Sequence, residues 1–194
     1  MIEEEIGTGN FTCRIIHFER EGFPVIFLHG YMFTSEVWRE IGVLDVLEGR
    51  KIPFIAIDMP YGMKSSCRPK SKDAEDSVSI VKEVVADSKP VIVGASLGGY
   101  IALRYATENP VKGLLLISPV RSLEEELLKG YDKLRGRVKI IYGQNDKIVP
   151  MEEMNRLSSI LKAELIVYED SGHPAYLDQP LRFTEDLLQF YDSL

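Results

Sequence analysis

The chain has 194 residues, of which 45% are hydrophobic, and its 23 Lys and Arg against 30 Asp and Glu give a formal net charge of −7. This acidic balance argues against a nucleic acid as the main partner, because a phosphate backbone is bound through excess positive charge. No apolar run approaches the roughly 20 residues that cross a bilayer. We therefore expect no membrane association and one globular domain over residues 1–194.

The chain begins with two predicted strands, residues 2–6 and 11–19, joined by the turn sequence GTGN. This pattern is typical of a hairpin. The next predicted strand, 24–30, has the apolar sequence PVIFLHG and ends at a glycine. Apolar residues at helical spacing then predict a helix over 35–48, with Ser35 as its N-cap.

From residue 52 onward, apolar strands alternate with helices. The predicted strands cover residues 52–58, 90–95, 113–118, 138–143 and 163–169. The predicted helices cover residues 73–87, 97–109, 121–130, 151–161 and 180–192. Continuous apolar strands that alternate with helices predict an α/β fold, with a mostly parallel sheet and helices on both faces. In such sheets function gathers at the carboxyl ends of the strands, so catalytic residues are expected there.

The two cysteines, Cys13 and Cys67, lie in unrelated sequence contexts, with no CxxC pair and no Cys/His cluster. We therefore predict two free thiols and no zinc site. Free thiols are typical of a reducing cytosol, and the N-terminal sequence MIEEEIGTGN lacks the basic and apolar regions of a signal peptide. Both observations predict a cytoplasmic location.

One strand end carries the sequence VIVGASLGGYIAL, in which Ser96 lies between Gly94 and Gly98. This G-x-S-x-G pattern follows a predicted strand and begins a predicted helix. In a nucleophile elbow the serine occupies such a sharp turn, and its neighbours are small so that the backbones pack closely. The helix N-terminus beneath the serine favours developing negative charge. We therefore interpret Ser96 as a nucleophile; the alternative is an ordinary glycine-rich turn with a capping serine.

A serine hydroxyl needs a base to take its proton, and the chain has three histidines. His173 follows the last predicted strand on a glycine-punctuated loop and is the best base by position, whereas His17 lies inside the predicted hairpin. The imidazole then needs a carboxylate to orient it. Asp146 follows strand 138–143, and we prefer it to Asp170, which lies too near His173 in sequence to reach the far side of the ring.

A serine nucleophile also needs two backbone N–H groups that face the oxyanion of a tetrahedral intermediate. We expect one from Leu97, directly after the nucleophile. We expect the other from Tyr31, on the loop that follows strand 24–30. His29 lies at the start of this loop, and we expect it to brace the loop rather than to act as the base.

Five segments, in this order and from residue 25 to the end, resemble motifs of the α/β-hydrolase superfamily: FLHGYMFTSEVW, AIDMP, VGASLGGYIAL, IYGQNDKIVP and DSGHPAYLDQP. The first and last are also similar to the small α/β-hydrolase-domain-14 branch, also called interacting factor B. The resemblance implies an α/β-hydrolase fold with Ser96 as nucleophile and with Asp146 and His173 as its partners. It also implies Tyr31 and Leu97 as oxyanion donors. The chain order serine, aspartate, histidine is the one found in α/β-hydrolases.

Two features depart from many members of the superfamily. Tyr61 and Met63 stand where many relatives have glycine, so we expect the loop near the cleft to take a different path. The insertion between strands 113–118 and 138–143 consists only of residues 119–137, which are too few for the cap domain that often closes the pocket. We therefore expect no sizeable cap domain and an open cleft that suits small or exposed acyl groups.

These residues predict a serine hydrolase that cleaves small carboxylic esters through an acyl-enzyme on Ser96, with no metal or organic cofactor. Its expected partner is a small-molecule acyl substrate. Two alternatives remain open: an acyltransferase or deacylase that passes the acyl group to a thiol such as coenzyme A, and a non-catalytic binding protein on a hydrolase fold. The loop residues that could line an acyl pocket are Met32, Phe33, Met59, Met63, Pro119 and Tyr176.

Overall fold

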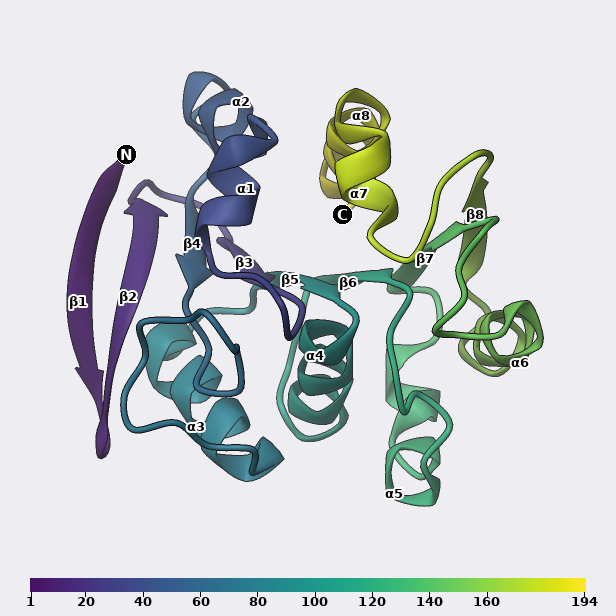
Figure 1. The fold of residues 1–194 in the computed structure, drawn as a ribbon, viewed down its shortest axis with the longest axis horizontal. Coiled ribbons are helices and arrows are strands. Elements are labelled where there is room, and N and C mark those ends of the chain that lie inside the picture. The colour runs from purple at the N-terminus through teal and green to yellow at the C-terminus, as the bar shows by residue number, and fades with distance from the viewer.

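The computed structural model describes residues 1–194 and contains one eight-stranded sheet (Figure 1). The strands lie side by side in the order β1-β2-β4-β3-β5-β6-β7-β8. Their bounds are β1 Ile2–Thr8, β2 Phe11–Phe18, β3 Val25–Leu28, β4 Phe54–Ile57, β5 Val91–Ala95, β6 Gly113–Ile117, β7 Val138–Gly143 and β8 Glu164–Tyr168. β2 pairs antiparallel with β1 and β4, and all other neighbours are parallel. The mostly parallel sheet with an N-terminal hairpin is therefore confirmed.

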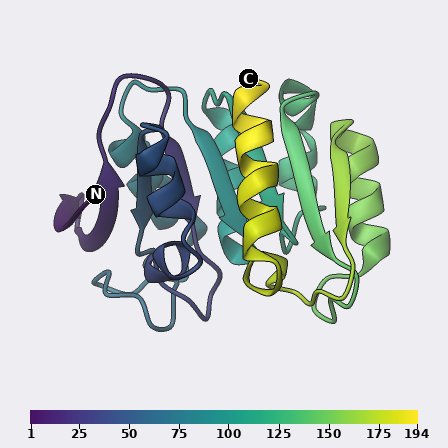
Figure 2. The ribbon, with the colours of Figure 1, turned by 90° about the horizontal axis from the view of Figure 1, so that it is seen from above.

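Helices cover both faces of the sheet, and α1, α2 and α8 lie in front of it in Figure 2. The helices of this face are α1 Glu36–Glu40, α2 Val43–Gly49, α7 Ala175–Asp178 and α8 Pro180–Asp192. The helices of the other face are α3 Ala74–Val85, α4 Leu97–Glu108, α5 Glu125–Leu128 and α6 Met151–Leu161, with a 3₁₀ turn at Tyr131–Leu134. None of these helices has the length and apolar character that crossing a membrane requires.

The sheet divides the hydrophobic core into two clusters of 32 and 23 buried residues. In β5, Ile92 belongs to the larger cluster, which is shared with α3, α4 and α6, while Val91 and Val93 belong to the smaller one. Successive strand side chains point to opposite faces, and both faces are covered, so every position of the central strands is apolar. The sheet is a rigid platform that presents the loops after its strands.

Two predicted helices differ from those observed. The helix expected over 35–48 is two shorter helices, because Gly42 has a left-handed φ of 78° between α1 and α2. The insertion over 119–137 holds only the short α5 and the 3₁₀ turn. Tyr131 and Leu134 from this insertion are buried in the larger core cluster, beside residues of α4. The insertion therefore packs beside α4 and forms no cap domain.

The prediction of two free thiols is wrong, because Cys13 and Cys67 form a disulfide and both side chains are fully buried. Cys13 lies on β2, and Cys67 lies on the long loop between β4 and α3. Reciprocal backbone hydrogen bonds between Thr12 and Arg68, of 2.7 and 2.9 Å, hold the two segments side by side. The cysteines are 54 residues apart, so no spacing pattern marks the pair. The thiol-based argument for a reducing cytosol no longer holds.

Candidate active site

Ser96 stands at the sharp turn between β5 and α4, where the elbow pattern predicts it. Its backbone has φ 53° and ψ −112°. Residues other than glycine rarely adopt a positive φ, and such strain costs on the order of 1–3 kcal/mol. The residue is half-buried at the start of α4, where free backbone N–H groups favour negative charge. This is the geometry of a nucleophile elbow.

The two glycines of the elbow allow the close approach of neighbouring backbones. A Cβ atom on Gly98 would collide with the carbonyl oxygen of Leu28, the last residue of β3. A Cβ atom on Gly94 would collide with the backbone of Gly98. The small residues in the G-x-S-x-G pattern are therefore required by the packing of β3, β5 and α4.

The predicted base and acid are in contact. His173 Nδ1 lies 2.8 Å from Asp146 Oδ2. Asp146 Oδ1 accepts hydrogen bonds from the N–H groups of Ile148, at 2.7 Å, and Val149, at 3.0 Å. Burial alone would raise the pKa of the fully buried Asp146 side chain, but its hydrogen bonds outweigh burial and lower that pKa. The ionised carboxylate therefore holds the Nδ1–H of His173 and leaves Nε2 free to take a proton.

Contacts between the loops after β7 and β8 bring these two side chains together. The Asn145 N–H donates to the carbonyl of Ser171 at 2.8 Å. A Cβ atom on Gly143, at the end of β7, would collide with the carbonyl oxygen of Gly172. Only glycine at this strand end lets the histidine loop pass so close to the aspartate loop.

The alternatives to this acid and this base, Asp170 and His17, form no hydrogen bond with the His173–Asp146 pair. Asp170 is exposed, with a left-handed φ of 58°, and the one carboxylate paired with His173 is that of Asp146. His17 is on β2, where its Nε2 lies 3.0 Å from a carboxylate oxygen of Glu4 on β1. The pairing that the sequence favours is thus the one that the structure contains.

The loop after β3 passes directly beside Ser96. A Cβ atom on Gly30 would lie 3.6 Å from Ser96 Cβ, and Tyr31 is the next residue. The Tyr31 N–H donates no hydrogen bond in the structure. Leu97 is the first residue of α4, so its N–H has no partner within the helix. Neither N–H group, that of Leu97 next to Ser96 in the chain or that of Tyr31 next to Gly30, therefore donates a hydrogen bond within the protein.

His29 braces this loop from beneath. Its buried ring accepts the Met59 N–H at Nε2, at 2.9 Å, and Nδ1 donates to the carbonyl of Gly30, at 2.8 Å. Because Nε2 accepts a hydrogen bond, it carries no proton, and the ring is the neutral Nδ1–H tautomer. Burial lowers the pKa of His29 and favours the same neutral form. The Tyr61 hydroxyl completes the brace by donating to the His29 carbonyl at 2.6 Å.

Some predicted pocket residues form an exposed apolar surface. Met32 and Met63 are each 49% exposed, and Tyr31 is 43% exposed. The Met63 N–H donates to the carbonyl of Tyr31 at 2.8 Å, so these residues lie on adjoining loops, one of which contacts Ser96 through Gly30. Their exposure fits the open cleft that the short insertion predicts.

The other predicted pocket residues are more buried. The ring of Phe33 meets that of Tyr176 edge-on, with centroids 6.4 Å apart, and Tyr176 is itself buried. Pro119 is buried and packs against Gly99 of α4. Met59 is fully buried in the larger core cluster, so its side chain serves packing. Of these four, Phe33 lies nearest the loop that flanks Ser96, because it also packs against Gly30.

Sequence reasoning missed Asp58, a second buried carboxylate that supports the loops of the site. Its Oδ1 accepts the N–H of Ser35 at 2.7 Å, and its Oδ2 accepts the N–H and hydroxyl of Ser66 at 2.8 and 2.9 Å. Burial would raise the pKa of Asp58, but these hydrogen bonds outweigh burial and lower it. Asp58 follows β4 directly, so the strand-end criterion that selected Asp146 could also have found it.

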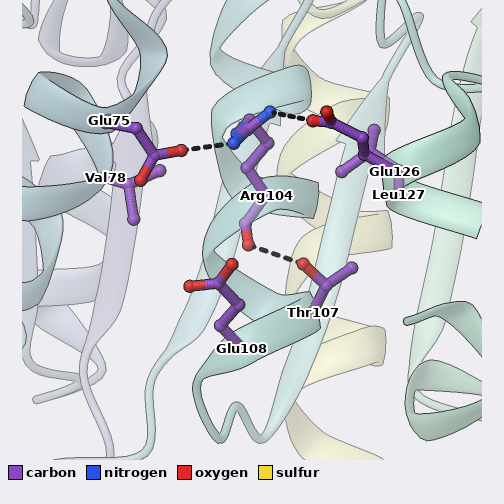
Figure 3. Close-up of a pocket in the computed structure, with 7 residues that line it drawn as sticks. All are labelled: Glu75, Val78, Arg104, Thr107, Glu108, Glu126 and Leu127. Atoms are coloured by element: carbon purple, nitrogen blue, oxygen red, sulfur yellow. Dashed lines mark hydrogen bonds and ion pairs between the residues drawn. The ribbon is translucent and has the colours of Figure 1, made fainter. Parts of the chain in front are cut away.

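A separate depression of about 220 Å³ lies over α3, α4 and α5 (Figure 3). Arg104 occupies it and bridges Glu75 of α3 to Glu126 of α5. Arg104 lies eight residues after Ser96 on α4, about 12 Å along the helix axis. This depression is therefore a helix-joining ion-pair cluster, remote from the nucleophile. No three His, Cys, Asp or Glu side chains converge anywhere in the fold as they would to hold a metal ion.

Comparisons with known proteins identify the family of this chain. Residues 25–138 match the family model described as "Alpha/beta hydrolase family". "Protein ABHD14A" of Mus musculus is 30% identical over 178 residues, which cover 88% of this chain and 70% of the mouse protein. "Putative protein-lysine deacylase ABHD14B" of Rattus norvegicus is 28% identical over 181 residues, which cover 89% of this chain and 84% of the rat protein. The narrower resemblance that the sequence motifs indicate is thus confirmed.

A solved structure shares the whole fold. The "predicted CIB-like hydrolase" from Thermoplasma acidophilum superposes with a TM-score of 0.88 and covers 100% of this chain and 98% of its own. It is 23% identical in sequence, so this match supports the fold and nothing finer. The α/β-hydrolase fold predicted from the sequence is confirmed.

Proposed function

This chain belongs to the alpha/beta hydrolase family, and from that premise we propose that it is a serine hydrolase that cleaves small carboxylic esters. One observation carries the proposal: His173 Nδ1 lies 2.8 Å from Asp146 Oδ2, on loops at the same sheet edge as the strained Ser96. Three strand ends supply a nucleophile, a base and an orienting acid in the chain order of this family.

The reaction proceeds in two halves. Ser96 Oγ attacks the acyl carbon while His173 Nε2 takes the hydroxyl proton, and Asp146 stabilises the resulting imidazolium. The imidazolium then gives that proton to the departing alcohol, which leaves an acyl-enzyme on Ser96. Water attacks this ester with His173 again as base, and the acid departs as the serine hydroxyl is restored.

The N–H groups of Tyr31 and Leu97 stabilise the oxyanion of each tetrahedral intermediate. Both are free of other partners, so no hydrogen bond has to break before they act. The neutral His29 ring donates to the Gly30 carbonyl, which fixes the loop that precedes Tyr31. Removing one such donor costs roughly 10²–10³ in kcat in serine hydrolases.

The acyl group is short, because little apolar enclosure lies near Ser96. The insertion at residues 119–137 packs beside α4, and Met32 and Met63 stay half exposed. Each added methylene gains about 0.8 kcal/mol only where the protein buries it. Catalytic efficiency therefore rises over the first carbons and then declines as longer chains fit poorly.

An ester series with a fluorophosphonate probe tests the proposal. We expect kcat/KM to peak at roughly two to six acyl carbons, and we expect the probe to label Ser96 alone. Peptide mapping that places the adduct on Ser118 or Ser171 would contradict the assignment of the nucleophile. A steady rise of kcat/KM through dodecanoyl esters would contradict the open cleft. A protein that neither reacts with the probe nor turns over any ester would instead be a binding protein on this fold.

A second candidate differs only in the acyl acceptor. The rat relative is named "Putative protein-lysine deacylase ABHD14B", and a thiol such as coenzyme A can attack the same acyl-enzyme in place of water. Product analysis distinguishes the two. If added thiol diverts acetyl groups from acetate to a thioester, the protein is an acyltransferase or deacylase; if acetate alone forms, it is a hydrolase.

A further inference from the structure

A shallow depression of about 280 Å³ lies between Tyr31 and the loop that joins β4 to α3. Its lining residues include Tyr31, Tyr61, Met63, Lys70, Ser71 and Lys72. Gly30 packs against Ser96 and Tyr31 follows it, so the Tyr31 end of the depression lies one residue away from the backbone that contacts Ser96. We call it the basic depression, because Lys70 and Lys72 are the charged residues that line it.

The loop that forms this wall has a charge opposite to that of the whole chain. Its sequence MKSSCRPKSK, residues 63–72, contains four basic residues and no acidic one, in a chain of net charge −7. The four are Lys64, Arg68, Lys70 and Lys72. None of them forms an ion pair with a carboxylate, so no acidic side chain directly occupies their charged groups.

Two of these cations hold the loop in shape. Lys70 Nζ donates to the carbonyls of Gly62 and Ser65, and Arg68 also donates to the carbonyl of Ser65. Burial and then the charge of Arg68 lower the pKa of Lys70, while Asp58 acts in the opposite direction. The backbone carbonyls orient these side chains but leave a positive potential at the wall of the depression.

Two acidic residues at the start of α3 accept hydrogen bonds within the protein. Asp76 accepts the Ser71 hydroxyl at 2.6 Å, and Asp73 caps α3 by accepting the Glu75 N–H at 3.0 Å. Lys72 is exposed and donates no hydrogen bond to the protein. It is therefore the cation of the basic depression that is free to meet a ligand.

We propose that the basic depression binds an anionic group, a carboxylate or a phosphate, on the leaving part of the substrate. This inference rests on the proposed hydrolase function and names a substrate class for it. A charged group belongs on the open side of the site, because burying a charge is costly, while the short acyl group turns toward Phe33. The exposed Tyr31 and Met63 supply apolar contact for the segment that links the ester to the anion.

Matched esters and lysine variants test the inference by activity. The substrates are acetyl aryl esters with a ring carboxylate, a ring phosphate or a neutral ring amide. We expect Lys72→Gln to raise the KM of an anionic ester relative to the neutral one by about three- to fivefold, and added salt to reduce the difference. Lys89→Gln is the matched control, because Lys89 is exposed and precedes β5, at the strand end opposite Ser96. Comparison of the two anionic esters tells which anion is favoured.

Binding to the Ser96→Ala protein gives a readout that needs no turnover. The probes are benzoate and phenyl phosphate, measured by calorimetry with and without Lys72→Gln. If Lys72→Gln weakens the binding of a probe and Lys89→Gln does not, the result supports anion binding at the basic depression, even if no ester is hydrolysed. Normal ester hydrolysis with no effect of Lys72→Gln in either experiment would overturn the inference and leave the proposed hydrolase function standing.

Discussion

The two halves of the sheet hold the candidate site in different ways. Between β5 and β8, each catalytic candidate stands on a short loop directly after its own strand, and Asp146 and His173 contact each other across two such loops. Between β1 and β4, the loop after β3 is held instead by the long loop over residues 58–72, which Cys13 and Cys67 tie to β2.

This difference separates chemistry from support. In the β5–β8 half, the candidate side chains of Ser96, Asp146 and His173 follow their own strands, so their removal should change the rate more than the fold. In the β1–β4 half, buried polar contacts place a backbone N–H, so their removal should change stability more than rate.

The largest effect is expected for Ser96→Ala. Loss of the nucleophile should lower kcat by roughly 10⁴-fold or more, as in other serine triads. The free energy of unfolding should stay nearly unchanged, because alanine keeps the Cβ and the same strained φ. Ester turnover and urea denaturation of the same preparation measure both. A variant with near-normal turnover would remove Ser96 from the mechanism.

Asp146→Asn should cost on the order of a thousandfold in kcat, because the amide no longer holds the Nδ1–H tautomer of His173. Asp170→Asn is the matched control. Asp170 is exposed and has a positive φ that asparagine tolerates well, so its rate should change less than threefold, within the range of ordinary surface substitutions. If the Asp170 variant is the slower of the two, the acid is wrongly assigned.

The predictability of the site follows the same division. Ser96, Asp146 and His173 could be found from the sequence because each follows an apolar strand that is itself recognisable. The same criterion reaches Asp58, although it does not show what that carboxylate holds. The loop after β3 could be placed from Gly30, because a loop that follows a central strand passes the end of the neighbouring strand.

The remaining features depend on how one loop folds back over another. The contact of Tyr61 with the His29 carbonyl and the pairing of Cys13 with Cys67 join segments that share no periodicity or spacing. The break at Gly42 was also missed, because the apolar helical spacing continues through it while its φ of 78° ends the helix. Such features require the tertiary path of the chain.

Removal of the disulfide tests whether the β1–β4 half of the sheet mainly supports the fold. Replacing both Cys13 and Cys67 by alanine should lower the free energy of unfolding by about 2–4 kcal/mol, because the crosslink restricts a long loop of the unfolded chain. Turnover per folded molecule should fall by less than tenfold, because the hydrogen bonds of His29 with Gly30, Met59 and Tyr61 do not involve either cysteine. Urea denaturation of the wild type with and without a thiol reductant, together with thiol titration, measures the effect. Two titratable thiols in the native, unreduced protein would show that this tether is absent.

The smallest effect, and the sharpest comparison, is expected for Asp58→Asn. The amide nitrogen cannot accept the hydrogen bonds that Ser66 donates to Oδ2, and an unsatisfied buried group costs about 1–3 kcal/mol. The pKa of Asp58 is lowered from 3.8 in the folded protein. The ionised Asp58 carboxylate therefore stabilises the fold fully at pH values above the pKa that Asp58 has in the unfolded chain. This stabilisation is lost as the pH falls through the lower pKa that Asp58 has in the folded protein.

The wild type and Asp58→Asn should therefore differ most in stability near neutral pH and converge below about pH 4, the ordinary pKa of an aspartate. Urea denaturation from pH 7 down to pH 3 measures this convergence, with ester turnover at pH 7 as the second readout. Asp146→Asn is the paired variant, because its carboxylate is also buried and its pKa is also lowered. Asp58→Asn should lose stability, and its turnover should fall less than tenfold. Asp146→Asn should lose far more turnover than Asp58→Asn does. Equal rate losses in the two variants would mean that both halves of the sheet act directly on the reacting atoms, and the division between chemistry and support would fail.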